Sequence, residues 1–424
     1  MVKIGTIVRA HLLVIVIIIL MDVCLVFAQS NIDEKIVRVE NGLVSDWNDP
    51  PWRKMNLVDR MDHYNVSGAT ITVIDNFEIS WTRTYGTIKT GTTDPVAEDT
   101  LFQAASLSKP VTALMVLHYV DQEMIDLDNP VNNYLKTWKI PDNEYTASNP
   151  VTIRQLLSHT AGLLEYGLPG YASEPYPTLS QILEGAPPAN TPPIEVVRTP
   201  GEQYVYSNFG YIVLQRLLED ITGEQFETLA ENLILDKLGM SSSTYTQPLR
   251  EDLQDRAAVG HRSNGVPLAE RWRVYPEQGA GGLWTTSADL AKFAVEVMLS
   301  KHGESNQVIS STMVDTMFSK PLEDSTGLGF GLGDDGGDLK YFLHRGANEG
   351  FKGIIVGYYE RGQGVVILTN SDNGDLFYDE VLKSVSFEYG WVKKGFSYAH
   401  GFILLLSIVL IFFVVKHMRS GRVP

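Results

Sequence analysis

One stretch, Phe102-Gln-Ala-Ala-Ser106-Leu-Ser-Lys109-Pro, decides how the fold of this 424-residue chain is interpreted. Apolar residues recur at intervals of three and four after it, which predicts a helix from Ser106 to about Asp128. Serine and lysine three positions apart then lie on one face, one turn from each other. Serine is a weak nucleophile that requires a neighbouring base, and lysine can be that base only if burial and the positive end of a helix lower its pKa. The spacing therefore predicts Ser106 as a nucleophile beside Lys109.

The Ser-x-x-Lys pattern alone is weak, because a chain of this length contains roughly one such match by chance. On these four residues alone, an N-cap serine with a surface lysine is the more common interpretation.

A second element, Tyr206-Ser-Asn208, follows roughly a hundred residues later in the chain. Residues two apart in an extended segment share a face, so Tyr206 and Asn208 can line one wall of a site. A tyrosine can relay the serine proton, and an asparagine can hold both a lysine and a substrate amide. The alternative is a tyrosine packed in the core, with Asn208 capping the helix predicted over Asn208–Thr222.

A third element, His344-Arg345-Gly346, lies in a strand-like segment. His344 and Gly346 would share a face, and the bare glycine would let a substrate approach the backbone. The N–H groups of Ala347 and Ser106 can then act as the two oxyanion donors. Arg345 should point to the opposite face, and only if it turned inward would it bind a substrate carboxylate. The alternative for His344 is a strand histidine that is simply packed or exposed.

The order of the motifs makes them a set. The series is Phe102-Gln-Ala-Ala-Ser-Leu-Ser-Lys-Pro, Leu156-Leu-Ser-His-Thr-Ala-Gly-Leu, Tyr204-Val-Tyr-Ser-Asn-Phe-Gly-Tyr, Gly281-Gly-Leu-Trp-Thr-Thr-Ser-Ala-Asp-Leu and His344-Arg-Gly-Ala. It resembles the class C β-lactamase-related family, a part of the serine β-lactamase and penicillin-binding-protein group that includes D-Ala-D-Ala carboxypeptidases, D-aminopeptidases and esterases. The resemblance covers roughly residues 55–390.

The resemblance implies roles for these residues. Ser106 would be the acylated nucleophile, with Lys109 and Tyr206 as the proton-transfer pair and the general base open between them. Asn208 would bind the substrate amide, and His344 would occupy the family's Lys or His position on the sheet edge.

The remaining implied roles concern the substrate and the scaffold. Gly346 and Arg345 complete the substrate-binding strand, Ser106 and Ala347 would donate the oxyanion N–H groups, and His159 would be structural. Arg345 replaces the family's usual hydroxyl residue, which helps to hold a substrate carboxylate. A true β-lactamase is therefore disfavoured.

Strand-like runs occur at both ends of the body, with helical segments between them. Ala69–Asp75 and Glu78–Thr84 predict a hairpin joined by Asn76-Phe77. Three further strands are expected in the last third, at Lys340–His344, Gly353–Tyr359 and Gly364–Asn370. The expected fold is α+β, an antiparallel sheet built from N- and C-terminal strands with an inserted helical subdomain, plus a C-terminal transmembrane helix.

Smaller features of the body also carry expectations. Short helices are predicted at Glu34–Val44 and Thr286–Leu299, and the Pro-rich stretch Ala186–Pro193 is expected to be a surface loop or lid.

The two ends of the chain predict a membrane protein. Residues 1–28 have the layout of a secretory signal, and an uncleaved anchor is the alternative. Residues 29–54 form a polar N-terminal segment, and residues 55–390 the hydrolase body. Residues 396–415 are nearly all apolar and long enough to cross a bilayer, which leaves 416–424 as a basic cytoplasmic tail. We therefore expect a single-pass protein of the cell membrane with its body on the extracytoplasmic side.

Composition narrows the partners. A net charge of −17 argues against nucleic acid, and the nine histidines form no HExxH or similar pair, so neither a metal nor a cofactor is expected. Two functional hypotheses remain. The first is a serine hydrolase that acts through a Ser106 acyl-enzyme on a peptide, amide or ester, with carboxypeptidase and esterase both open. The second is a catalytically silent, membrane-tethered binding or receptor relative of the same family.

Overall fold

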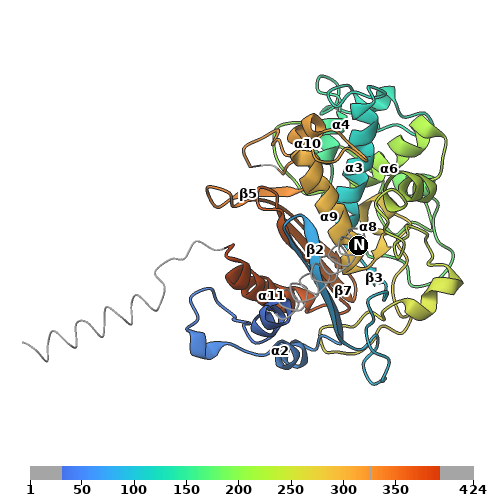
Figure 1. The fold of residues 1–424 in the computed structure, drawn as a ribbon. Coiled ribbons are helices and arrows are strands. Elements are labelled where there is room, and N and C mark those ends of the chain that lie inside the picture. Colours follow the sequence, from blue (N-terminus) through green and yellow to red (C-terminus); the bar gives the residue numbers. More distant parts are fainter. Residues whose placement is uncertain (1–30, 325, 392–424) are drawn as a thin grey trace, which may run out of the picture.

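The computed structural model describes residues 31–324 and 326–391. Its centre is a six-stranded antiparallel sheet in the order β2-β1-β8-β7-β6-β5 (Figure 1). The strands are β1 (Gly68–Asp75), β2 (Glu78–Gly86), β5 (Gly331–Asp334), β6 (Lys340–Asn348), β7 (Phe351–Tyr358) and β8 (Gln363–Thr369). Because β1 pairs with β8, the two ends of the body close one sheet, and this part of the expected fold is confirmed.

The N-terminal hairpin forms where the sequence predicts it. Asn76 and Phe77 connect β1 to β2, and both have positive φ angles, 59° and 62°. A two-residue turn with two left-handed residues matches the twist of the flanking strands. The second strand continues to Gly86, two residues beyond the predicted end.

Alternating side chains divide the sheet between two apolar cores. On β8, Val365 and Ile367 join one cluster, whereas Val366 and Leu368 join the other. Strand side chains alternate between faces, so a strand that is apolar throughout is buried on both sides. Figure 1 shows α2 (Leu57–Tyr64) and α11 (Gly374–Tyr389) on one side of the sheet, with α9 (Ser287–Lys301) on the other.

The inserted helical part lies on the α9 side of the sheet (Figure 1). Its remaining helices and short turns are η2 (Ala105–Leu107), α3 (Ser108–Asp121), η3 (Val131–Asn133), α4 (Ile153–Leu157), α5 (Leu179–Glu184), α6 (Asn208–Thr222), α7 (Phe226–Ala230), the π-helical turn η4 (Glu231–Leu235), η5 (Glu251–Arg256), α8 (Gln278–Gly281) and α10 (Ser311–Met317). A two-stranded ladder joins β3 (Phe102–Gln103) to β4 (Trp284–Thr285), and η1 (Pro51–Arg53) lies in the N-terminal segment.

Several predicted boundaries differ from the observed ones. Helix α6 matches its prediction and ends at Gly223, whose φ of 79° gives a left-handed C-cap. The helix predicted from Ser106 to Asp128 is shorter, because Ser106 lies in η2 and α3 ends at Asp121. Among the described residues, the first helix covers residues 31–40, so it ends before the predicted Val44. Strand β5 was not predicted, because its glycine-rich sequence has no apolar alternation.

The expected fold class is wrong in its transmembrane helix. Within residues 31–324 and 326–391, no helix is long and apolar enough to cross a bilayer. Without that helix, the fold class is α+β. The predicted span at 396–415 lies outside the described residues, as do the expected signal at 1–28 and the tail at 416–424.

Candidate active site

Ser106 lies in a strained turn between strand β3 and helix α3. The preceding residue, Ala105, has a φ of 52°, a left-handed conformation that costs a non-glycine residue roughly 1 kcal/mol. The turn is held from the helix side, where the Ser108 hydroxyl donates to the carbonyl of Ala105 at 2.6 Å and accepts from the N–H of Leu283 at 3.1 Å. A strained backbone conformation persists only where the surrounding structure fixes it, as these two hydrogen bonds do here.

Lys109 is fully buried and contacts three oxygen atoms. Its Nζ lies 2.9 Å from Ser106 Oγ, 2.8 Å from Asn208 Oδ1 and 2.7 Å from the carbonyl of Ala280. Burial lowers the pKa of Lys109 to about 7, since a charged amine is costly away from water. A neutral lysine has two N–H groups and one lone pair. Two of the acceptors can take the N–H groups, which leaves the lone pair for the hydroxyl proton of Ser106.

Tyr206 completes the group around the Ser106 hydroxyl. Burial raises the pKa of its phenol to about 12, although a hydrogen bond with Ser106 opposes this rise. The phenol is therefore protonated at neutral pH and can pass on a proton, but it is not a phenolate base. The Lys109 Nζ lies 5.2 Å from the centre of the Tyr206 ring. The ring of His344 lies 6.5 Å from that of Tyr206, centre to centre.

Asn208 is the first residue of α6 and does not cap it with its side chain. Its Oδ1 accepts from Lys109, and its Nδ2 donates to the carbonyl of Tyr166 at 2.8 Å. Both ends of the amide are thus bonded within the protein. The interpretation of Asn208 as a helix cap is excluded. The second N–H of its Nδ2 takes part in neither of these bonds, as the expected contact with a substrate amide requires.

His344 lies on β6 and is buried and neutral. Its Nδ1 lies 2.8 Å from the carbonyl of Arg345 and donates to it, which leaves Nε2 as an acceptor. Burial, followed by the neighbouring Lys109 charge, lowers the pKa of His344 to about 3. At neutral pH this position therefore offers no positive charge to a substrate.

Arg345 points away from Ser106. Its guanidinium lies 3.1 Å from the carboxylate of Asp379 and 3.4 Å from the hydroxyl of Tyr378, both on α11 at the opposite face of the sheet. The alternation of strand side chains explains this orientation. The structure therefore does not bring Arg345 together with the other predicted site residues.

Gly346 and Ala347 lie where β6 meets the turn that carries Ser106. A Cβ added at Gly346 would lie 2.3 Å from the carbonyl oxygen of Ala104, so only glycine permits this approach. Strand β5 pairs with β6 only as far as Leu343. The edge at Gly346 and Ala347 is therefore not covered by β5, as an oxyanion donor at Ala347 requires.

Two groups at the site were not assigned a catalytic contact from the sequence. His159 has a φ of 58°, its Nδ1 accepts from the N–H of Ser207 at 3.1 Å, and its ring lies 4.4 Å from that of Tyr206. It thus positions the second motif. The carbonyl of Ala280 is a backbone group, and its only sequence signal is the surrounding Gly-Ala-Gly-Gly run, where glycines let backbones approach.

The site carries no sign of a metal centre. Within the described part of the chain, no group of three or more His, Cys, Asp and Glu side chains is arranged to hold a metal ion.

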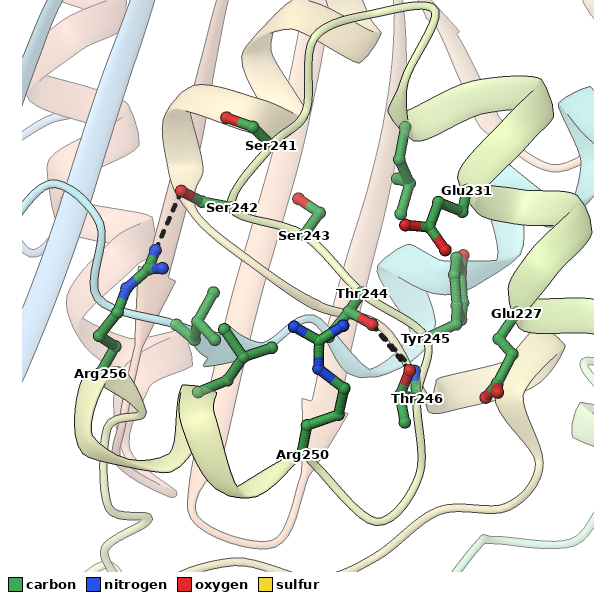
Figure 2. Close-up of a pocket in the computed structure, with 13 residues that line it drawn as sticks. Glu227, Glu231, Ser241, Ser242, Ser243, Thr244, Tyr245, Thr246, Arg250 and Arg256 are labelled. Atoms are coloured by element: carbon green, nitrogen blue, oxygen red, sulfur yellow. Dashed lines mark hydrogen bonds between the residues drawn. The ribbon is translucent and has the colours of Figure 1, made fainter.

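A separate pocket of about 140 Å³ lies beside η5 (Figure 2). Its lining is mostly hydroxyl and charged groups, including Ser242, Arg250 and Arg256. None of the predicted site residues lines it. Its link to the site is the hydroxyl of Tyr245, which donates to the carbonyl of Ser108 at 3.1 Å.

Comparison with known proteins places the chain in a family. The family model described as Beta-lactamase matches residues 55–383. A teichoic acid D-alanine hydrolase of Staphylococcus aureus is 22% identical over 358 residues, or 82% of each chain.

Solved structures share the fold. An octameric penicillin-binding protein homologue from Pyrococcus abyssi superposes with a TM-score of 0.66 at 22% identity, over 79% of this chain and 76% of the other. A D-amino acid amidase of Ochrobactrum anthropi gives 0.63 at 21% identity, over 79% and 96%. The family model matches more than half of the chain, and the five sequence motifs agree with this match. The chain is therefore a hydrolase of the β-lactamase family.

Proposed function

We propose that this protein hydrolyses esters or amides of D-alanine-like acyl groups through an acyl-enzyme on Ser106. The observation that carries the proposal is the distance of 2.9 Å between Ser106 Oγ and the Nζ of a buried lysine whose pKa is close to 7. A nucleophile needs a base in hydrogen-bond reach and of suitable pKa, and Lys109 meets both conditions.

The chemical steps follow from these contacts. Lys109 takes the proton of Ser106 as Oγ attacks the substrate carbonyl, and the N–H groups of Ser106 and Ala347 bind the oxyanion. The proton then passes, by way of the Tyr206 hydroxyl, to the leaving oxygen or nitrogen, whose bond to the acyl carbon breaks. Water attacks the acyl-enzyme in the reverse sense, so Lys109 accepts a proton from water and Ser106 regains its own.

The substrate class follows from the charges on β6. Penicillins and peptides that end in D-Ala-D-Ala carry a free carboxylate on the leaving-group side. His344 is neutral and Arg345 is paired with Asp379 on the far face, so neither residue offers that carboxylate a cation. An ester or amide without that carboxylate fits better. The teichoic acid D-alanine hydrolase and the D-amino acid amidase named above agree with this choice.

The setting is a second part of the proposal. The signal-like pattern of residues 1–28 supports an extracytoplasmic body, where cell-envelope esters would be available. Digestion of intact cells with an external protease tests this, because a body on the cytoplasmic side would be protected.

A substrate panel tests the function. The purified protein and its Ser106→Ala variant are each given a D-alanyl ester, a D-alanyl amide, a D-Ala-D-Ala peptide and a penicillin. We expect Ser106-dependent turnover of the ester or amide at least about 10-fold faster than that of the two carboxylate substrates. Faster turnover of the peptide or penicillin would contradict the substrate class. No Ser106-dependent turnover of any compound would favour the silent binding relative.

A further inference from the structure

A short loop borders the site on the α6 side. We call residues 164–168 the lip loop. The Ser207 hydroxyl donates to the carbonyl of Leu164 at 2.8 Å, and Asn208 Nδ2 donates to the carbonyl of Tyr166 at 2.8 Å. Glu165, the residue between these two carbonyls, is therefore attached on both sides to the motif that carries Tyr206.

The carboxylate of Glu165 is available to a ligand. Its side chain is exposed and forms no ion pair with any residue that the structure describes. The adjacent segment carries Arg198, which donates to the carbonyl of Leu163 at 3.5 Å, and Glu195, whose carbonyl accepts from Leu164.

Another carboxylate of the β6 region is already occupied. Glu349 lies 2.7 Å from Arg273 and 2.8 Å from Arg262, and both contacts are ion pairs. Glu165, by contrast, forms no ion pair with a described residue. Burial raises the pKa of Tyr204, two residues before Tyr206, and the Glu165 charge adds to this rise. The second motif and the Glu165 carboxylate are thus within electrostatic reach of each other.

A substrate with a free amine needs an acceptor next to the acyl carbon. The Oδ1 of Asn208 already accepts a hydrogen bond from Lys109, and its Nδ2 is a donor, so the neutral Asn208 amide offers an ammonium group no negative charge. A neutral amine on the substrate would compete with Lys109 for the Asn208 Oδ1 and the Ala280 carbonyl. An ammonium group is bound more strongly by a carboxylate than by a neutral oxygen, and the lip loop supplies a carboxylate at the edge of the site.

We propose that Glu165 binds the free α-ammonium group of an aminoacyl ester or amide and selects such substrates over acyl groups without an amine. This inference rests on the proposed function, because it names the acyl group that Ser106 receives. Glu165 takes no part in the proton transfers. It contributes a charge-assisted contact that is present in both the bound substrate and the transition state.

Two esters that differ only in the amine test the inference. They are the 4-nitrobenzyl esters of D-alanine and of propionic acid, measured with the full-length wild type, Glu165→Gln and a matched control, Glu195→Gln. Glu195→Gln also removes one exposed carboxylate from a neighbouring segment. Unlike Glu165, however, Glu195 does not lie between the two carbonyls that accept hydrogen bonds from Ser207 and Asn208.

The expected result is selective. Glu165→Gln should lower kcat/KM for the D-alanyl ester by about 10- to 100-fold, mainly through KM, and leave the propionyl ester within about 2-fold. Glu195→Gln should leave both esters within about 2-fold. The wild-type preference for the D-alanyl ester should fall as ionic strength rises, because the contact is exposed.

The failures can be told apart. If the wild type hydrolyses the esters but Glu165→Gln keeps the same preference, or if Glu195→Gln loses as much as Glu165→Gln, the role of Glu165 is overturned and the proposed function stands. If the wild type hydrolyses neither ester, the proposed function fails, and this inference fails with it.

Discussion

The carbonyl oxygen of Ala280 lies 2.7 Å from the Nζ of Lys109, on the side chain that also contacts Ser106. Together with Asn208 Oδ1, it binds two N–H groups of the buried amine. This arrangement fits a neutral lysine whose lone pair faces Ser106 Oγ, because an ammonium group would place a full charge in a site without a counterion. A backbone carbonyl on α8 thus helps to orient the Nζ of Lys109, the proposed base, next to Ser106.

Lys109 should therefore set the acid limb of the pH profile. Its pKa is lowered from the usual lysine range to about 7, and only the neutral form accepts a proton. The value of kcat/KM should fall about tenfold per pH unit below pH 7 and become constant above it. The measurement uses an ester with no ionisable group, so that only the enzyme titrates. A profile that stays flat down to pH 5 would exclude Lys109 as the base.

Arg345 should be nearly dispensable for catalysis. It pairs with Asp379 on the face opposite Ser106, and both side chains are about half exposed. Arg345→Ala should change kcat/KM by less than about 3-fold and the free energy of unfolding by less than about 1 kcal/mol. Steady-state kinetics and urea unfolding check the two values. A loss of more than about 30-fold with an unchanged free energy of unfolding would show that Arg345 reaches the substrate.

Gly346 should not tolerate any side chain. An added Cβ would lie 2.3 Å from the carbonyl of Ala104, in the turn that carries Ser106. Gly346→Ala should lower the free energy of unfolding by about 1–3 kcal/mol and reduce kcat/KM by roughly 100-fold, because it displaces Ser106, the proposed nucleophile. Gly331→Ala on β5 is the control, since its nearest contact would be an ordinary 3.5 Å. Equal effects of the two substitutions would contradict the close packing of β6 on this turn.

Glu277 should make stability depend on pH. Its side chain is fully buried, and neither carboxylate oxygen has a hydrogen-bond partner among the described residues. Burial raises the pKa of Glu277 from 4.5 to about 7, so the folded state prefers the protonated acid. The resulting destabilisation is absent below pH 4.5, grows as the pH rises, and is complete above pH 7, where it reaches about 3 kcal/mol.

The variant Glu277→Gln keeps the shape of the side chain and cannot ionise. It should match the wild type near pH 4 and be more stable near pH 8 in denaturant unfolding. A difference that is the same at both pH values would show that Glu277 does not titrate in this range.

Local signals explain which parts of the structure were predictable. Three patterns depend only on residues that are close in the sequence, and all three are present in the structure. They are the spacing of Ser106 and Lys109, the helical period of α6 with its terminal Gly223, and the alternation of apolar residues in the strands. These residues lie together in the structure as the motif order led us to expect. The positions of Ser106, Lys109, Tyr206 and Asn208 rest on such signals, whereas their catalytic roles stay predictions.

The parts that were missed depend on tertiary contacts. The carbonyl of Ala280, the left-handed Ala105 and the lip loop have no side-chain pattern of their own, because each is shaped by distant segments of the chain. Strand β5 is recognisable only by its pairing with β6. The membrane helix was inferred from hydropathy alone, and no described helix supports it.

Intact-mass measurement of the purified protein during turnover of a D-alanyl ester tests the central claim most directly. The sample is quenched in acid within seconds and then digested for peptide mapping. The proposed mechanism predicts a mass increase of one alanyl group, located on the peptide that contains Ser106 and absent in Ser106→Ala. Turnover that persists in Ser106→Ala, or an alanyl group attached to a different residue, would contradict the acyl-enzyme mechanism.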